Sequence, residues 1–296
     1  MNDIKKRVQE DFEKFSADYP EDAYIKSLVL DEKSTYSSPR EANNVGVDYV
    51  YATQHQYAMN WLMEIEAANK GKFSVARKGG ECQYQCLDVG SQFSFVSVAS
   101  SLANFVIADP SLNFVGKDGT PARRMHAIDL GIMWADAEAQ DLYFIEDNGM
   151  RVVTSLHAIE HFGLGRYGDS IDPEGDMKGL REFNRVLTTP GFFIGSVPIE
   201  LSGSERVVFN RNRIYSIPMV QKMLRDCGFE IIDHIVASSC SGIIHSHQVH
   251  GDYTATSVRP EEFEQALTHV LKSDPELKET PNSAYVWLAK KVRNLS

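Results

Sequence analysis

The chain has 296 residues, of which 43% are hydrophobic and 24% charged, the composition of an ordinary globular protein that can bury a large core. Acidic residues outnumber basic residues by 41 to 30, and the resulting net charge of −11 argues against nucleic acid as a partner. No window holds the roughly 18 unbroken apolar residues of a membrane span, and the charged N-terminus has no apolar signal core, so we expect a cytoplasmic protein with no membrane partner.

The first 80 residues predict a helical extension. An amphipathic helix is expected from about Asp3 to Phe15 and a second helix from about Tyr49 to Ala68. The stretch between them is polar, and no strong strand signal occurs in this part of the chain. The sequence therefore predicts an N-terminal helical extension over residues 1–80 and one larger domain over residues 81–296.

Short apolar runs alternate with helical segments from Tyr84 onward, as in α/β proteins whose parallel strands are joined by crossover helices. We expect strands at 84–89, 105–108, 125–128, 152–156, 192–197, 230–237 and 284–289. Helices are expected at 93–102, 174–187 and 217–227. This alternation predicts an α/β fold.

A segment of about residues 238–280 breaks the alternation and is predicted to be an inserted lid, with a helix at 260–271. Histidines alternate along it at His245, His247 and His250. Zinc needs a closed set of about four ligands. We therefore interpret His245 and His247 as substrate-facing side chains rather than metal ligands.

Acidic residues follow three successive predicted strands. Asp88, at the end of the first strand, is followed by Gly90 and Ser91. Asp109 follows the second strand and Asp129 the third. Ligands of open α/β sheets bind at the carboxyl ends of the strands, where carboxylates accept hydrogen bonds from ribose hydroxyls or an adenine amino group. The three acids together predict a nucleoside site, although each alone is also explained by the capping of backbone N–H groups.

The fourth predicted strand leads into the segment that carries the catalytic candidates. It ends in small polar residues, and Glu160 and His161 follow before a glycine turn at 163–165. An imidazole has an ordinary pKa of about 6.5, close to working pH. We therefore predict His161 as a general base, with Glu160 orienting it. The alternative is that His161 only hydrogen-bonds the glycine turn.

The order of these motifs resembles the class I S-adenosylmethionine-dependent methyltransferases over about residues 81–293. The resemblance lies in LDVGS, VIADP, HAIDL, VVTSLHAIEHFG, VLTTPGFFIGSVP and the closing AYVWLAKKV. The segments EHFGLGRYGDSIDPEGD and NRNRIY further resemble a small branch of this superfamily that carries EHxGLGRYGD. The resemblance implies a Rossmann-like sheet, mostly parallel, with an antiparallel last strand.

The resemblance also implies that S-adenosylmethionine lies across the strand tips. Asp109 would contact the ribose, and Asp129 and Leu130 the adenine. Asp88 and Gly90 would face the methionine portion. The other predicted cofactor-binding residues are Ser91, Ser155, Leu156 and His157. Methyl transfer then asks the protein to align an acceptor atom with the S–CH₃ bond and to take up a proton if the acceptor is a hydroxyl.

The predicted acceptor is a hydroxyl of a small polar molecule, preferably a sugar or a nucleotide-linked sugar, because the inserted segment is polar and lacks a broad apolar lining. The predicted substrate-binding residues are Arg166, Tyr167, Asp169, Asn210, Arg213, Tyr215, His245 and His247. The acids Asp169, Asp172, Glu174 and Asp176 form a cluster whose carboxylates suit a hard cation such as Mg²⁺, but a metal ion is not expected, because the dipole of the following helix also explains Glu174 and Asp176. The sequence leaves open whether the chain forms a homo-oligomer.

Two alternative functions follow from the segment after the first strand. Class I methyltransferases usually carry several glycines there, whereas LDVGSQFSF contains only Gly90. The chain is therefore alternatively a catalytically silent module that keeps the fold as a binding surface. An NAD-dependent oxidoreductase ranks last, because it would need a GxGxxG motif that this segment lacks.

Overall fold

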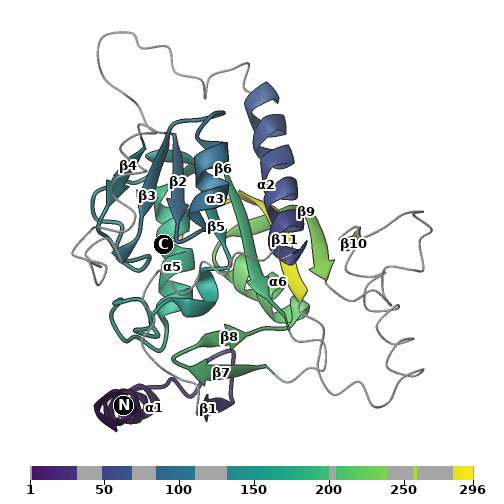
Figure 1. Cartoon of the computed structure of the whole chain (residues 1–296). Coiled ribbons are helices and arrows are strands. Elements are labelled where there is room, and N and C mark those ends of the chain that lie inside the picture. The colour runs from purple at the N-terminus through teal and green to yellow at the C-terminus, as the bar shows by residue number, and fades with distance from the viewer. Residues whose placement is uncertain are drawn as a thin grey trace, which may run out of the picture.

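The computed structural model describes residues 2–31, 49–68, 85–110, 132–199, 205–238, 256–258 and 283–295. These residues form an α/β arrangement in which a central sheet lies between helices (Figure 1). The predicted strand at 125–128, the predicted helix at 260–271 and most of the inserted segment fall outside them. Within the described ranges, no helix combines the length and the apolar character needed to cross a bilayer.

Eight strands build the main sheet. They are β2 (Cys86–Val89), β3 (Phe105–Ala108), β4 (Met133–Ala135), β5 (Met150–Leu156), β6 (Leu187–Pro198), β9 (Phe229–Ser238), β10 (Thr256–Val258) and β11 (Ser283–Lys291). Their order across the sheet is β10-β9-β11-β6-β5-β2-β3-β4. The strands from β6 to β4 pair in parallel, and β11 pairs antiparallel with both β6 and β9. This confirms the predicted mostly parallel α/β sheet with an antiparallel last strand.

Helices cover both faces of this sheet. The helices of the described residues are α1 (Asn2–Ala17), which packs on the small second sheet, α2 (Tyr49–Ala68), α3 (Phe93–Ala99), the 3-10 helix η2 (Ile159–His161), α5 (Gly175–Val186) and α6 (Ile217–Asp226). In Figure 1, α2 and α3 lie on one face and α5 and α6 on the other. The predicted α-helices that fall within the described residues are confirmed to within one helical turn at each end.

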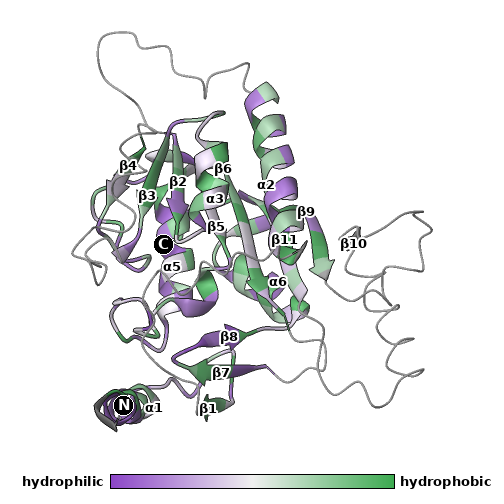
Figure 2. Ribbon diagram, in the orientation of Figure 1, coloured by the Kyte–Doolittle hydropathy of each residue, from purple (hydrophilic) through white to green (hydrophobic). Residues whose placement is uncertain are grey.

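The core is divided into two apolar clusters, one on each face of the sheet, because successive side chains of a strand point to opposite faces. In β2, Leu87 and Val89 join the cluster under α5 and α6, whereas Cys86 joins the cluster under α2 and α3. Phe193 and Ile194 of β6 divide in the same way. Figure 2 shows the hydrophobic residues along β3, β6 and β9. Burial on both faces explains why these strands read as nearly continuous apolar runs.

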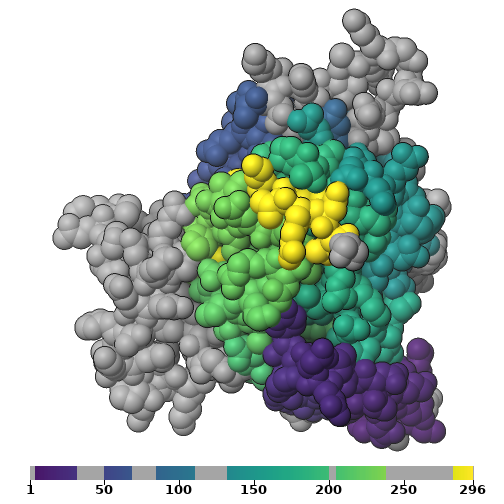
Figure 3. All heavy atoms as spheres, turned by 180° about the vertical axis from the view of Figure 1, so that it is seen from behind, coloured from purple at the N-terminus to yellow at the C-terminus, as the bar shows by residue number. Residues whose placement is uncertain are grey.

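A second sheet of three strands lies beside the main one (Figure 1). It consists of β1 (Leu28–Leu30), β7 (Arg206–Phe209) and β8 (Asn212–Ile214). β1 pairs in parallel with β7, and Phe15 of α1 packs on Phe209 with ring centroids 4.9 Å apart. Figure 3 shows the N-terminal segment that contains α1 and β1, in purple, against the rest of the molecule. The first 80 residues therefore contain a strand although they carry no strong strand signal, because a three-residue strand is too short to show an alternating pattern.

Helix α2 is tied to the main sheet by side chains. Gln54 Oε1 accepts a hydrogen bond from the Ser196 hydroxyl at 2.7 Å, and Trp61 Nε1 donates to Asp233 Oδ2 at 3.1 Å. Both partners lie on strands, Ser196 on β6 and Asp233 on β9. The predicted extension thus supplies one of the helices that cover the sheet, and a division of the chain at residue 80 stays a prediction.

Candidate active site

The first two predicted acids gather at the carboxyl ends of β2 and β3. β2 lies between β3 and β5, with Asp88 level with Ile107 of β3 and with Thr154 of β5. Asp109 directly follows the last residue of β3 and is also buried. The structure therefore places Asp88 and Asp109 at neighbouring strand tips, as the spacing predicted.

Asp88 is fully buried and is held by the strands around it. Its carboxylate accepts hydrogen bonds from the backbone N–H of Ser91 at 3.1 Å and from the Thr154 hydroxyl at 2.6 Å. Burial raises the pKa of Asp88 to about 6, against the effect of these hydrogen bonds, and the nearby Asp109 adds to the rise. Asp88 thus shapes the loop after β2 as well as carrying charge.

Gly90 makes the tight turn after β2. Its φ is +75°, in the left-handed region that glycine adopts readily. A Cβ at this position would lie 2.8 Å from the Cβ of Ala158, which belongs to the segment after β5. The turn therefore requires glycine both for its backbone angle and for the close approach of the two segments.

The remaining predicted cofactor residues bond the β2 loop to β5 and β6. The Ser155 hydroxyl donates to a carbonyl of β2 at 2.9 Å, and the backbone N–H of Leu156 donates to Ser91 Oγ at 2.9 Å. The backbone N–H of His157 donates to Ser196. These bonds explain the small polar side chains at the strand ends, and contact of the same residues with a cofactor stays a prediction.

Asp136 lies at a third strand tip. The strand that pairs with the outer side of β3 is β4, at Met133–Ala135. Asp136 directly follows β4 and is exposed, and the backbone N–H of Asp109 donates to the carbonyl of Ala135 at 3.2 Å. Asp129 and Leu130 lie outside the described residues, so their contact with an adenine stays a prediction.

Two histidines flank a buried carboxyl group after β5. Glu160 Oε1 lies 3.9 Å from His157 Nδ1 and 3.8 Å from His161 Nε2. Burial raises the pKa of Glu160 to about 8 and lowers the pKa of His157 to about 3. At physiological pH the carboxyl group is therefore protonated and the imidazole of His157 neutral, so the cluster carries no ion pair.

A backbone hydrogen bond fixes the orientation of His161. Its Nδ1 lies 2.6 Å from the carbonyl oxygen of Arg211, so the ring donates through Nδ1–H and leaves Nε2 as the basic nitrogen. The side chain is 22% exposed, and its partial burial lowers the pKa of His161. This side-chain bond goes to Arg211 and not to the glycine turn of the alternative interpretation.

Asp169 closes the loop between η2 and α5. Its carboxylate accepts three backbone hydrogen bonds of 2.9 to 3.2 Å, from Gly163, Gly165 and Tyr167. The loop presents Tyr167 edge-on to His161, with ring centroids 5.2 Å apart. It also brings the charge of Arg166 close enough to lower the pKa of His161. Asp169 thus holds the loop that carries the predicted acceptor residues.

Buried polar side chains support this loop from β7 and β8. Arg213 is 1% exposed and donates to two backbone carbonyls of the loop before α5, at 2.6 and 3.1 Å. Asp176 Oδ2 lies 3.5 Å from the Arg213 guanidinium and accepts from the Tyr215 hydroxyl at 2.9 Å. Asn210 is buried, and its side-chain amide has no partner among the described residues. Arg213 and Tyr215 are thus held inside the protein, and their contact with an acceptor stays a prediction.

Helix α2 brings further polar side chains to the site. The Tyr51 hydroxyl lies 3.2 Å from His157 Nδ1, and the two rings pack with centroids 4.8 Å apart. His55, one turn further along, packs on Phe95 at 5.4 Å. Sequence reasoning missed both residues, because their four-residue spacing indicates a shared helix face but not what that face contacts.

The described ranges contain no group of three or more His, Cys, Asp or Glu side chains placed to hold a metal ion. His245 and His247 lie outside these ranges, so their predicted contact with a substrate stays a prediction.

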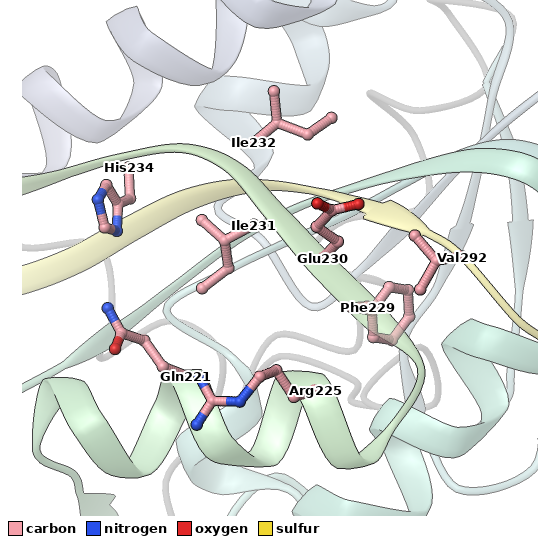
Figure 4. A pocket seen from close by; sticks show the side chains of 8 residues that line it. All are labelled: Gln221, Arg225, Phe229, Glu230, Ile231, Ile232, His234 and Val292. Atoms are coloured by element: carbon pink, nitrogen blue, oxygen red, sulfur yellow. The ribbon is translucent and has the colours of Figure 1, made fainter.

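A pocket of about 580 Å³ opens away from this site, between α6 and β9. In Figure 4, Gln221 and Arg225 extend from α6 toward the strand. The lining includes Phe229, the first residue of β9, so the pocket lies toward the amino end of the parallel strands. The Tyr285 hydroxyl already engages His234 Nδ1 at 2.6 Å and Gln221 Nε2 at 3.4 Å. The pocket holds none of the predicted site residues.

A family model described as a Caenorhabditis protein of unknown function, DUF268, matches residues 138–261. The matched range includes Glu160, His161 and the loop closed by Asp169, but not the tips of β2 and β3. A search of curated proteins found no match to the sequence.

Solved structures share the architecture. A Burkholderia thailandensis 1,6-didemethyltoxoflavin-N1-methyltransferase, with bound 1,6-didemethyltoxoflavin and S-adenosylhomocysteine, matches with a TM-score of 0.50 and 14% identity over 86% of this chain and 84% of that chain. The chain has the class I methyltransferase fold. The [4+2]-cyclase SpnF matches with a TM-score of 0.45 and 17% identity over 80% and 81% of the two chains. A methyltransferase from Methanosarcina mazei matches with a TM-score of 0.43 and 12% identity over 72% and 94%.

The class I methyltransferase fold does not by itself assign a reaction, since one fold hosts many functions. At the identities found here the likeness concerns the fold alone. The chemistry of this chain is therefore argued from its own side chains.

Proposed function

We propose that the chain binds S-adenosylmethionine at the carboxyl edge of its sheet and transfers the methyl group to a hydroxyl of a small polar acceptor. A sugar or a nucleotide-linked sugar is the preferred acceptor class. The observation that carries the proposal is that Asp88 and Asp109 lie at the tips of β2 and β3, while the segment after the neighbouring β5 carries His161, whose Nε2 is left as the basic nitrogen by the hydrogen bond of Nδ1. The class I methyltransferase fold supports the choice of cofactor.

The side chains at the strand tips fit the chemistry of this cofactor. An ionised carboxylate only accepts hydrogen bonds, and ribose and adenine offer hydroxyl and amino donors. Asp109 is 7% exposed and Asp136 is exposed, so the tips of two neighbouring strands carry one buried and one exposed carboxylate that can accept hydrogen bonds. When bound, S-adenosylmethionine supplies a methyl group on a positively charged sulfur, and an acidic edge favours that charge.

His161 is the proposed general base. Because Nδ1–H is bonded to the Arg211 carbonyl, the lone pair of Nε2 remains to accept the proton of an acceptor hydroxyl. Burial lowers the pKa of His161, which keeps the ring neutral at physiological pH and also makes it a weaker base than a free imidazole. Glu160, at 3.8 Å from Nε2, is beyond ordinary hydrogen-bond distance and is proposed to orient the segment.

Acceptor contacts are proposed for the residues around His161. Arg166 Nη1 and the side-chain amide of Asn210 are buried without partners in the described part of the chain. Buried polar groups are nearly always hydrogen-bonded, so these atoms suit a polar ligand. Tyr167 would pack on the acceptor beside His161. The inserted segment, with His245 and His247, is proposed to close over it.

Calorimetry with S-adenosylhomocysteine tests the cofactor half of the proposal. The wild type should bind, and Asp109→Ala should bind at least about tenfold more weakly, as expected for a lost hydrogen bond to a charged group. Asp141→Ala, which removes an exposed acid away from the strand tips, is the matched control and should bind like the wild type. No heat from the wild type would contradict the proposal and favour the silent binding module.

Transfer of a labelled methyl group to a panel of acceptors tests the second half. The panel should contain free sugars, nucleotide-linked sugars, a catechol and an amine. With a hydroxyl acceptor, His161→Ala should lower turnover by about 10²- to 10⁴-fold, the usual effect of a general base. Undiminished turnover in His161→Ala would instead favour a nitrogen acceptor, which needs no strong base.

A further inference from the structure

Three polar side chains that take no part in the proposed proton transfer meet beside Glu160. Tyr51 and His55 come from α2, and His157 follows β5. The centroid of the Tyr51 ring lies 4.8 Å from that of His157 and 6.2 Å from that of His55. Both imidazoles therefore flank one phenol ring, at the same edge of the sheet as the proposed base.

Each of these imidazoles keeps one nitrogen without a partner. Nε2 of His55 and Nε2 of His157 are buried and make no hydrogen bond to any described residue. His157 Nδ1 is engaged by the Tyr51 hydroxyl at 3.2 Å, so Nε2 is its remaining polar atom. Buried nitrogens are hydrogen-bonded in the great majority of proteins. Two neighbouring exceptions indicate a ligand that brings the missing partners.

The helix that carries His55 is held in place on either side of it. Gln54 accepts the hydrogen bond from Ser196, and Trp61 donates to Asp233. His55 also packs on Phe95 of α3. Because these contacts fix the face that α2 turns to the sheet, the helix cannot rotate His55 into solvent without breaking them.

The lack of charge on His55, His157 and Glu160 determines which kind of ligand fits beside them. Burial lowers the pKa of His55 to about 4 and that of His157 to about 3, and it raises the pKa of Glu160 to about 8. All three side chains are therefore uncharged at physiological pH. A carboxylate, phosphate or ammonium group would be buried there without an opposite charge. A hydroxyl both donates and accepts, as a neutral imidazole does with its two nitrogens, and is the complementary group.

We propose that Tyr51, His55 and His157 form a subsite for the uncharged, hydroxylated part of the acceptor, with the two Nε2 atoms bonded to neighbouring hydroxyl groups. The subsite rests on the proposed function and narrows it. In this proposal, side chains of α2 help to bind the uncharged, hydroxylated part of the acceptor, and Arg166 is available to bind an anionic part.

Variants of His55 separate recognition from packing. His55→Phe keeps an aromatic ring against Phe95 and Tyr51 but removes the nitrogen atoms. His55→Gln places an amide near the position of Nε2 and should rescue binding. Gln56→Ala changes an exposed neighbour on the same helix and is the matched control. Tyr51→Phe, which removes one hydroxyl, is a second variant should His55→Phe fail to fold.

Saturation-transfer NMR with methyl glucoside and myo-inositol, with and without S-adenosylhomocysteine, measures the subsite directly. Gluconate serves as the charged comparison. The wild type should bind both neutral polyols in preference to gluconate. His55→Phe should weaken polyol binding about tenfold, the effect of one hydrogen bond, while His55→Gln stays within about threefold of the wild type. The affinity for S-adenosylhomocysteine should be the same in all variants.

Three results would overturn the subsite: no binding of either polyol, a preference for gluconate, or polyol binding that is equal in His55→Phe and the wild type. A fourth is a loss of S-adenosylhomocysteine affinity in His55→Phe that matches the loss of polyol affinity, which would make His55 a structural residue. If the wild type binds polyols with the expected dependence on His55 but does not bind S-adenosylhomocysteine, the subsite stands and the proposed methyl transfer falls.

Discussion

Glu160→Gln should change how the stability of the protein depends on pH. The Glu160 side chain is 3% exposed, and burial raises its pKa from 4.5 to about 8. Between these two values the unfolded chain has released this proton and the folded chain has kept it. The folded state then binds more protons, so the free energy of unfolding falls as the pH rises. The amide of the variant does not titrate and lacks this dependence.

The range from pH 6.5 to 8 isolates the effect of Glu160. The pKa values of His157, His55 and His161, lowered from 6.5, act in the opposite direction and mainly below about pH 7, where the unfolded rings still bind protons, and this effect is common to the wild type and the variant. The pKa of Asp88, raised to about 6, acts only below this range. A difference of one bound proton between the folded and unfolded states changes the free energy of unfolding by about 1.4 kcal/mol for each pH unit. Across the range, the wild type should therefore lose about 2 kcal/mol relative to Glu160→Gln.

Urea unfolding at half-unit steps from pH 6.5 to 8, at constant ionic strength, measures this difference. The gap in unfolding free energy between Glu160→Gln and the wild type should widen in favour of the variant. Glu64→Gln makes the same chemical change on an exposed part of α2 and should run parallel to the wild type. A gap that stays constant or narrows would mean that Glu160 is ionised, paired with His157 or His161, and would refute the reasoning.

Three further substitutions test the loops of the site. Gly90→Ala should destabilise the protein by about 1–3 kcal/mol, because φ is +75° there, and an unchanged melting temperature would contradict this. Asp169→Ala should speed tryptic cleavage after Arg166, since three backbone N–H groups lose their acceptor; cleavage at the wild-type rate would show that the loop does not depend on them. Arg213→Met should cost about 3–5 kcal/mol in chemical unfolding by leaving the buried Asp176 without its cation and two carbonyls without a donor, whereas a smaller loss would indicate that water replaces the guanidinium.

The main sheet could be predicted because its strands are buried on both faces. The run Phe105–Ala108, for example, is apolar at every position, and predicted helices separate such runs. The small sheet could not be predicted in the same way. β1 has three residues and β8 has three, and β1 is paired with a strand from the second half of the chain. Pairing over such a distance leaves no local pattern in the sequence.

The same distinction between local patterns and distant pairing applies to the residues of the site. Asp88 and Asp109 were predictable, because the end of a parallel strand fixes where the next side chain lies. The position of Asp136 depends on which short run pairs with β3, and the composition of the three-residue strand β4 does not indicate that pairing. The bond from His161 to the Arg211 carbonyl involves a main-chain atom, which any residue would supply. Sequence patterns therefore indicate which residues reach the site, and tertiary contacts decide which atoms remain available.

The pairing of β1 with β7 has a consequence for chain synthesis. Arg211, whose carbonyl orients His161, lies in the turn between β7 and β8, and its guanidinium bonds Asp31 just after β1 at 3.0 Å. A ribosome releases residues 28–30 long before residues 206–214, so β1 must wait for its partner while β2 to β6 are made. The proposed base is therefore oriented only after these strands have been made, and nascent chains that end before Arg211 would carry the tips of β2 and β3 without an oriented histidine.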